Sequence, residues 1–291
     1  MLITGANGVI GSDLVKFFSK KNKVFALYRT PNKITKTLKN KNIIWIKHDL
    51  SNKIKKNINP KIIIHCAVTH AHSKKNKYSD YLNSNIIGLK NVLDFSKRKK
   101  VKKIFHLSTI NVYGLINSKI LNETNPFIKP NLLGATKILM EEMISTQSMN
   151  YLNIRLPGVV GYQINDTRRP WFCKIANKLK NNEDVEIFND EKKFNNLLDS
   201  YEVFKFINFM ISKKKFLNGE INFAASKPKK LRSIINQSKK ILNSESKINY
   251  NKKKNIHFII STNKLSKLYN YKISRIDQIV SRYLNHFKKN F

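Results

Sequence analysis

Residues 1–18 read MLITGANGVIGSDLVKFF, and this stretch decides the fold. An apolar segment comes first, glycines follow at positions 5, 8 and 11, and an amphipathic stretch comes next. This is the strand–turn–helix context that a dinucleotide-binding turn requires. Gly5 would permit the tight turn, Gly8 would let backbone N–H groups approach a diphosphate, and Gly11 would let helix and strand pack closely. The other turn residues expected to line the cofactor are Asn7, Val9 and Ile10. Taken alone, the glycines could also form an ordinary βα turn.

The first half of the chain alternates β-branched or aromatic runs with amphipathic stretches. Strands are predicted near residues 23–28, 42–47, 61–67, 102–109 and 150–158, and helices near 12–20, 83–99 and 134–147. This alternation favours a Rossmann-type α/β fold, a doubly wound parallel sheet with right-handed crossovers. Because the alternation stops after Gly158, we expect residues 1–157 to form the dinucleotide-binding domain and 158–291 a smaller C-terminal substrate lobe. Segments near 198–224 are expected to return to the sheet, and 249–255 to form a loop.

The net charge is the unusual feature of the composition. Lys+Arg 56 against Asp+Glu 18 gives +38 over 291 residues. Such a balance would suggest nucleic acid or an anionic membrane surface as a partner. The lysines are instead scattered, often beside Asn and Ile, whose codons are AT-rich like those of lysine, so genome bias explains the excess. We therefore expect no specific nucleic-acid partner, and only salt-dependent attraction of polyanions.

The sequence also bears on location and metals. No apolar run approaches the ~18 residues of a membrane-spanning helix, and the first residues lack the charged region of a signal peptide. Two cysteines, Cys66 and Cys173, are too few for a disulfide framework and have no metal-site spacing. The expectation is a reducing, cytoplasmic location and no metal.

Several segments carry a resemblance to a known family. The TGxxGxxG spacing of residues 4–11 is similar to that of short-chain dehydrogenase/reductases, and the chain resembles their extended branch, the NAD-dependent epimerase/dehydratase family. The further matching segments are HDL at 48–50, HCAV at 65–68, Asn85 in NIIGLKNVL, LSTINVYG at 107–114, GATKILMEE at 134–142, RLPGVVG at 155–161 and FNNLLDSYEV at 194–203. The resemblance implies a nucleotide-sugar substrate, and a homodimer is compatible with it.

The resemblance also implies the binding residues. Besides the turn, the cofactor residues would be Asp49, Leu50, Ala67, Asn85, Lys137 and Pro157. Arg29 follows the second strand, where a carboxylate would favour NAD, and it can accommodate a 2′-phosphate. NADP is therefore slightly favoured over NAD, although stacking of Arg29 on the adenine would admit both. The substrate residues would be His70, Arg168, Arg169, Trp171 and Asn195.

The catalytic pattern is incomplete. The family uses a Ser or Thr, a Tyr and a Lys, with the lysine lowering the pKa of the phenol. Thr109 and Lys137 occupy the hydroxyl and lysine positions, but Leu133 stands where the tyrosine belongs. Since leucine carries no proton, His70 and Tyr113 are the candidate substitutes.

Two functions remain open at this point. One is a nucleotide-sugar epimerase or 4-ketoreductase, slow or with a displaced proton donor. The other is a non-catalytic NAD(P)-binding protein, and a nucleic-acid-binding relative is a weaker third alternative. The 4,6-dehydratases place Asp-Glu directly after the threonine, and Ile110 and Asn111 stand there instead. That subclass is set aside, because its acid and base are missing.

Overall fold

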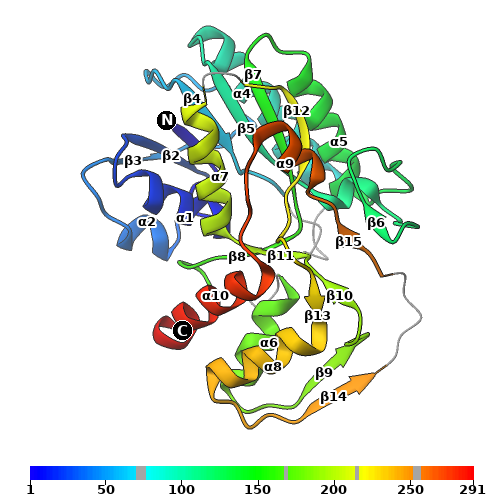
Figure 1. Cartoon of the computed structure of the whole chain (residues 1–291). Coiled ribbons are helices and arrows are strands. Elements are labelled where there is room, and N and C mark those ends of the chain that lie inside the picture. The colour runs from blue at the N-terminus through cyan, green and yellow to red at the C-terminus, as the bar shows by residue number, and fades with distance from the viewer. Residues whose placement is uncertain (70–76, 167–169, 214–215, 252–256) are drawn as a thin grey trace. The chain divides into compact units, whose positions relative to one another are not determined.

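The computed structural model describes residues 1–69, 77–166, 170–213, 216–251 and 257–291. The chain forms two compact units, each assembled from three segments (Figure 1). Unit 1 comprises Met1–Leu115, Pro126–Leu156 and Phe204–Ile221, and unit 2 comprises Ile116–Asn125, Pro157–Val203 and Asn222–Phe291. Within the described ranges, no helix is long and apolar enough to cross a membrane.

Unit 1 is built on a seven-stranded sheet. Its strands are β1 (Leu2–Thr4), β2 (Val24–Tyr28), β3 (Ile43–Lys47), β4 (Ile62–His65), β5 (Lys103–Thr109), β7 (Asn150–Leu156) and β12 (Gly219–Asn222). They run in the order β12-β7-β5-β4-β1-β2-β3, and every pairing from β3 through β7 is parallel. The strand order reverses between β1 and β4, as in a doubly wound sheet. The predicted Rossmann-type α/β class is confirmed.

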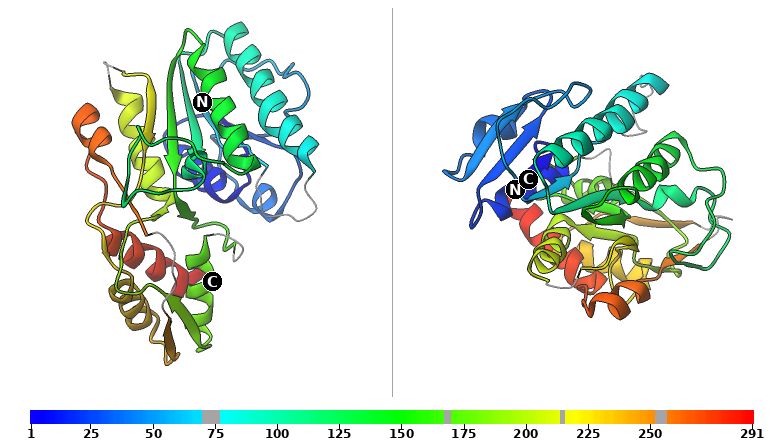
Figure 2. Two further views of the ribbon diagram at one scale, coloured as in Figure 1. Left: turned by 90° about the vertical axis from the view of Figure 1, so that its right-hand side faces the viewer. Right: turned by 90° about the horizontal axis from the view of Figure 1, so that it is seen from above.

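Helices cover both faces of this sheet (Figure 2). They are α1 (Val9–Phe18), α2 (Lys33–Thr37), α3 (Tyr78–Tyr81), a π-helical turn η1 (Leu82–Ile87) continuing into α4 (Gly88–Arg98), a 3-10 turn η2 (Ile110–Tyr113), α5 (Leu132–Ser145) and α7 (Ser200–Ser212). On one face, Phe95 of α4 and Met140 of α5 join one core with the strand residue Ile63. On the other face, Phe18 of α1 meets Phe204 of α7 with ring centroids 4.8 Å apart. The apolar stripes of the helices thus bury a sheet that is apolar on both sides.

Unit 2 consists of short strands and helices. Its elements are β6 (Ile120–Leu121), β8 (Gly158–Val160), α6 (Trp171–Lys180), β9 (Val185–Phe188), β10 (Lys193–Phe194), β11 (Leu197–Asp199), β13 (Lys229–Lys230), α8 (Leu231–Leu242), β14 (Ile248–Asn251), β15 (Ile259–Ile260), α9 (Asn263–Tyr269) and α10 (Ile276–Asn290). Buried aromatic residues of α6 and α10, such as Phe172 and Tyr283, pack together with centroids 6.1 Å apart. Strand β14 covers residues 249–251, where the sequence had suggested a loop.

A charged cluster inside unit 2 stabilises its fold. Arg282 of α10 donates to Asp199 at 2.7 Å and to Glu202 at 2.6 Å, and both carboxylates are fully buried. Tyr162 also donates to Asp199, at 2.6 Å. Buried charges persist only where they are paired in this way, so the cluster fixes α10 against the end of β11.

Candidate functional site

The glycine turn of unit 1 is built by close backbone approach. Gly5 has φ +61°, and a Cβ there would lie 2.8 Å from the Ala67 backbone nitrogen at the end of β4. A Cβ at Gly11 would lie 2.1 Å from the Gly5 carbonyl oxygen, so only glycine lets α1 start this close to β1. Gly8 is exposed at the N-cap of α1, whose first turn carries no acidic side chain. The first N–H groups of a helix have no intrahelical acceptor, so this turn offers donors to an anion.

Neighbouring side chains hold the turn against the end of β2. Asn7 donates to the Thr30 carbonyl at 2.7 Å, and Asn32 donates back to the Asn7 carbonyl at 2.9 Å. Arg29 lies in the same segment and donates to the Ser84 hydroxyl at 3.3 Å. The turn and Arg29, which the sequence assigned to one cofactor site, therefore belong to one connected loop system.

Asp49 and Asn85 are fixed by hydrogen bonds of their own. Asp49 accepts from the backbone and hydroxyl of Ser51. Partial burial alone would raise the Asp49 pKa, but these bonds and nearby Arg29 lower it below its usual range, so the carboxylate stays ionised. Asn85, in the π-helical turn η1, accepts from the Thr69 backbone at 2.8 Å and donates to Thr136 of α5 at 3.0 Å. Such π-turns are frequent at functional sites.

Lys137 of α5 is buried at the carboxyl ends of β4 and β5. It is 2% exposed, donates to the Leu107 carbonyl at 2.7 Å and lies 2.9 Å from His106 Nε2. Burial lowers the Lys137 pKa to about 7, although electrostatic interactions with Glu141 and Cys66 act to raise it.

Two of the predicted catalytic positions lie near the same strand and helix. Leu133 lies one helical turn before Lys137 and is 3% exposed. Thr109 ends β5, and its hydroxyl accepts from the Asn111 backbone at 3.2 Å, which caps η2. The roles assigned to these residues stay predictions.

A second buried cluster connects the ends of β5 and β7 to α5. Arg155 of β7 forms a bidentate pair with Glu141 of α5 at 2.6–3.2 Å and donates to the Tyr113 hydroxyl at 3.0 Å. Ser108 donates to the same carboxylate at 2.5 Å. Because Tyr113 is 1% exposed and held by Arg155, its contacts do not support it as the substitute proton donor.

Pro157, predicted to contact the cofactor, joins β7 to β8. Of the predicted substrate residues, His70, Arg168 and Arg169 lie outside the described residues. Trp171 begins α6, is 40% exposed and meets the Phe194 ring at 5.5 Å. Asn195 is buried, donates to the Ala225 and Ile260 carbonyls and accepts from the Ile260 backbone. These contacts tie segments of unit 2 together and give no support to Asn195 as a substrate ligand.

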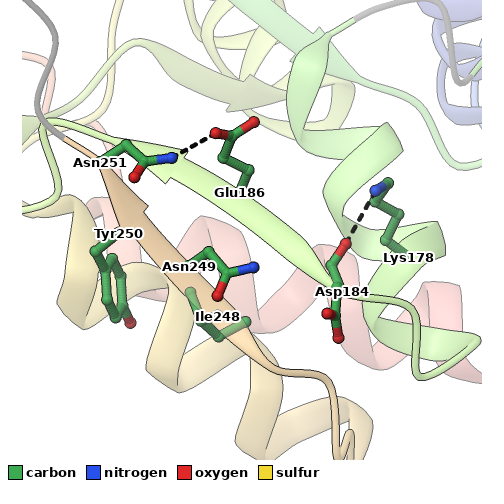
Figure 3. A pocket seen from close by; sticks show the side chains of 7 residues that line it. All are labelled: Lys178, Asp184, Glu186, Ile248, Asn249, Tyr250 and Asn251. Carbon is green, nitrogen blue, oxygen red and sulfur yellow. Dashed lines mark hydrogen bonds between the residues drawn. The ribbon is translucent and has the colours of Figure 1, made fainter.

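An open pocket of about 720 Å³ lies on unit 2 beside the β9–β14 ribbon (Figure 3). Lys178 donates to the Asp184 carbonyl at 2.9 Å, and Asn251 donates to the Glu186 carboxylate. The residues lining it include none of the predicted site residues. It therefore contributes nothing to the assignment of the site.

Comparison with known proteins decides the family. A sequence model of the NAD dependent epimerase/dehydratase family matches residues 1–224. The chain belongs to this family. Its members are NAD-dependent enzymes, which places this epimerase/dehydratase chain among enzymes in general.

Individual proteins are similar to this chain over nearly its whole length. The uncharacterized protein MJ1055 of Methanocaldococcus jannaschii is 25% identical over 320 residues, covering 100% of this chain and 96% of the relative. The Bordetella bronchiseptica enzyme WbmG in complex with NAD has a TM-score of 0.84 at 14% identity, over 99% of this chain and 94% of that one. The UDP-N-acetylglucosamine 4-epimerase from Methanobrevibacter ruminantium M1, in complex with UDP-N-acetylmuramic acid, has a TM-score of 0.83 at 20% identity, over 100% and 98%. At these identities the structural likenesses show the fold alone.

The candidate site contains buried partners that the sequence reasoning missed. His106, Asn153 and Glu141 were overlooked, although all three lie inside or beside segments quoted for the resemblance. Alternation along β5 and β7 would have placed His106 and Asn153 on one face, but nothing local indicates that they pair. Their contact follows from the β5–β7 register, in which these two residues are partners.

Proposed function

We propose that this chain is an NAD(P)-dependent nucleotide-sugar epimerase or 4-ketoreductase that works without the usual tyrosine. The observation that carries the proposal is the glycine turn at the N-terminus of α1, in the same unit as the buried Lys137 at the strand ends. Ligands of doubly wound sheets bind at the carboxyl ends of the strands, near the switch in strand order. Family membership supports the redox part, and the UDP-sugar derivative in one structural neighbour supports the nucleotide-sugar part.

The described residues fit a dinucleotide. The cradle at Gly5, Gly8 and Gly11 admits a diphosphate, and Arg29 and the ionised Asp49 would meet the adenosine half. When bound, the nicotinamide would take a hydride from a sugar carbon and return it. Because an arginine and no carboxylate follows β2, we propose that NADP is accepted at least as well as NAD.

The second candidate is a non-catalytic NAD(P)-binding protein. Leu133 favours it, since a buried leucine stands at the proton donor's position and Tyr113 is engaged in the core. Retention of Lys137 and Thr109 favours the enzyme, although Lys137 could serve cofactor binding alone. Turnover separates the two, because both candidates bind the cofactor.

The test combines binding with turnover. Calorimetry with NADH and NADPH should show binding that Gly8→Val abolishes and Arg29→Asp shifts toward NADH. NAD(P)H absorbance, which reports 4-ketoreduction, and chromatography of the sugar products, which reports epimerisation, are then followed over UDP-, GDP-, CDP- and dTDP-sugars. We expect slow turnover by the wild type and acceleration by Leu133→Tyr, since a positioned acid–base group contributes ~10²–10⁴-fold.

Leu132→Tyr is the matched control, because it places the same phenol one residue earlier at a position that is 44% exposed. Acceleration by both variants would point to a nonspecific effect. If both the wild type and Leu133→Tyr bind the cofactor and neither turns over any sugar, the result favours the non-catalytic binding protein.

A further inference from the structure

Four buried or half-buried side chains form a continuous chain of hydrogen bonds behind Lys137. Lys137 Nζ lies 2.9 Å from His106 Nε2, and His106 Nδ1 lies 2.9 Å from Asn153 Oδ1. Asn153 Nδ2 in turn donates to Glu220 Oε1 at 3.2 Å. The chain crosses α5, β5, β7 and β12, and neither the family resemblance nor the catalytic pattern assigned any role to its last three members.

The chemistry of each partner fixes the direction of every bond. A carboxylate only accepts, so Glu220 holds the Asn153 amide with Nδ2 toward it and Oδ1 toward His106. The Oδ1 atom also only accepts, so His106 carries its proton on Nδ1 and presents a lone pair at Nε2. Lys137 is therefore the donor in its contact with His106.

A neutral Lys137 amine can make both of its observed contacts. A neutral amine has two N–H groups and one lone pair, whereas an ammonium has three N–H groups and no lone pair. Within the described part of the chain, the Lys137 nitrogen has two acceptors, His106 Nε2 and the Leu107 carbonyl. In the neutral form, these two contacts would use both N–H groups and leave the lone pair able to accept a proton.

The charged and titratable groups around Lys137 act in both directions. His65 and Cys66 face it from the end of β4, and His106 faces it from β5. Burial is the main reason why the His65 pKa is lowered to about 3 and the His106 pKa lies well below its usual value, and the positive charge that Lys137 carries when protonated lowers both further. Both rings are thus neutral. Glu141 faces Lys137 from its own helix, but Arg155 of β7 pairs with that carboxylate.

We propose that the Lys137 amine is itself the acid–base group of the site, and that His106, oriented by Asn153 and Glu220, is its positioning residue. This inference rests on the proposed function. In the oxidation direction, the amine lone pair would take the proton of the sugar hydroxyl as the carbon–hydrogen bond breaks, and a bound nicotinamide would supply the hydride acceptor. The O–H and C–H bonds of the sugar would be lost, and a C=O double bond, an N–H bond on Lys137 and a C–H bond on the cofactor would form. The reverse step would return both hydrogens to the sugar. With Lys137 in this role, no other tyrosine is needed to replace the one that is missing at Leu133.

The first measurement is an NMR titration, which requires neither bound cofactor nor catalytic activity of the variants. The Lys137 side-chain methylene signal is assigned in the NMR spectrum of the ¹³C-lysine protein as the signal missing from Lys137→Arg. It should titrate near pH 7 in the wild type. His106→Gln, which keeps an oxygen acceptor, should leave that midpoint nearly unchanged, and His106→Phe should move it by about one pH unit or more. A Lys137 midpoint near that of an exposed lysine, or equal midpoints in all three proteins, would overturn the proposal.

The second measurement is the pH profile of sugar oxidation. Below pH 7 the rate should rise about tenfold per pH unit and then level off, because the neutral amine is the base. The oxidation rate of Lys137→Met and Lys137→Arg should be ~10²–10⁴-fold lower than that of the wild type. Both variants should also lack the acid limb of the pH profile, since methionine carries no titratable proton and a guanidinium does not give up its proton. His106→Phe should move the limb and His106→Gln should preserve it, which a merely structural histidine would not do. Lys90→Met, at an exposed lysine of α4, is the control.

The outcomes separate the two proposals. Turnover with the same acid limb in Lys137→Met and the wild type would overturn this inference and leave the proposed function standing. Absence of turnover by the wild type, despite cofactor binding, would overturn both.

Discussion

The buried histidines of unit 1 predict a specific loss of stability in acid. His65 is fully buried beside Thr4, which lies 2.8 Å from its Nδ1, and its Nε2 has no partner among the described residues. Burial, followed by the charge of Lys137, lowers its pKa to about 3. In the unfolded chain the same ring regains its ordinary pKa of about 6.5. Between these two pH values the unfolded state binds a proton that the folded state does not bind. The free energy of unfolding therefore falls as the pH falls through about 6.5.

The magnitude follows from the two pKa values. From pH 7 to pH 5 the unfolded ring becomes protonated while the folded ring stays neutral. At 1.36 kcal/mol per pKa unit, this lowers the free energy of unfolding by about 2 kcal/mol for His65 alone. The side chain is 0% exposed, so solvent does not screen this penalty. Below about pH 3 the folded ring also protonates, and the His65 contribution stops growing.

Urea denaturation at pH 7, 6 and 5 measures this effect, with urea chosen because guanidinium salts would screen the other charges. His65→Gln keeps a side chain that can bond Thr4 but takes up no proton, so its loss from pH 7 to pH 5 should be smaller than that of the wild type by about 2 kcal/mol. His48→Gln, at a half-buried histidine in the loop after β3, is the matched control. If wild type and His65→Gln lose stability equally over this range, His65 is protonated in the fold and the reasoning fails.

Three further substitutions test the packing of the two units. Gly11→Ala places a Cβ 2.1 Å from a carbonyl oxygen and should lower both the Tm and the dinucleotide affinity. Gly8→Ala, whose Cβ would lie 3.3 Å from its nearest neighbour, should keep the fold, and equal Tm values of the two variants would contradict this. Glu141→Gln leaves Arg155 with an unmatched buried charge and should cost about 3–5 kcal/mol in urea unfolding, and a loss under about 1 kcal/mol would show that the pair is not needed. Arg282→Met removes the cation that pairs with two buried carboxylates and should cost roughly 2–3 kcal/mol, a modest figure because Arg282 is 30% exposed. An unchanged urea midpoint would refute this prediction.

The parts of the fold that could be predicted are those encoded locally. The glycine turn lies within one run of eleven residues, and Gly5 and Gly11 each stand at a close backbone approach in the structure. The β–α alternation of the first half predicted the parallel sheet because buried strands read as continuous apolar runs. In contrast, η1 was expected to be ordinary helix, since a π-helical turn has no distinct residue pattern.

The parts that could not be predicted depend on pairs distant in sequence. His106 and Asn153 meet only because β5 and β7 pair in one register, and Glu220 joins them through a strand more than sixty residues further along. Arg155 was quoted only as the start of a motif, although its pair with Glu141 connects β7 to α5. Such contacts require the three-dimensional register, which composition and periodicity do not supply.

The alternation of the two units along the chain constrains how the protein can be made. Six segments alternate between the units, and the short segment Ile116–Asn125 lies in unit 2, where β6 pairs with β15 near the other end of the sequence. During synthesis, β6 emerges about 140 residues before β15 and cannot form this pairing until β15 has been made. Non-local pairing of this kind slows folding and exposes strand edges to misassembly. We expect no single cut to yield two pieces that fold alone, and an exchange of one unit with a relative would need every crossing point to be joined correctly.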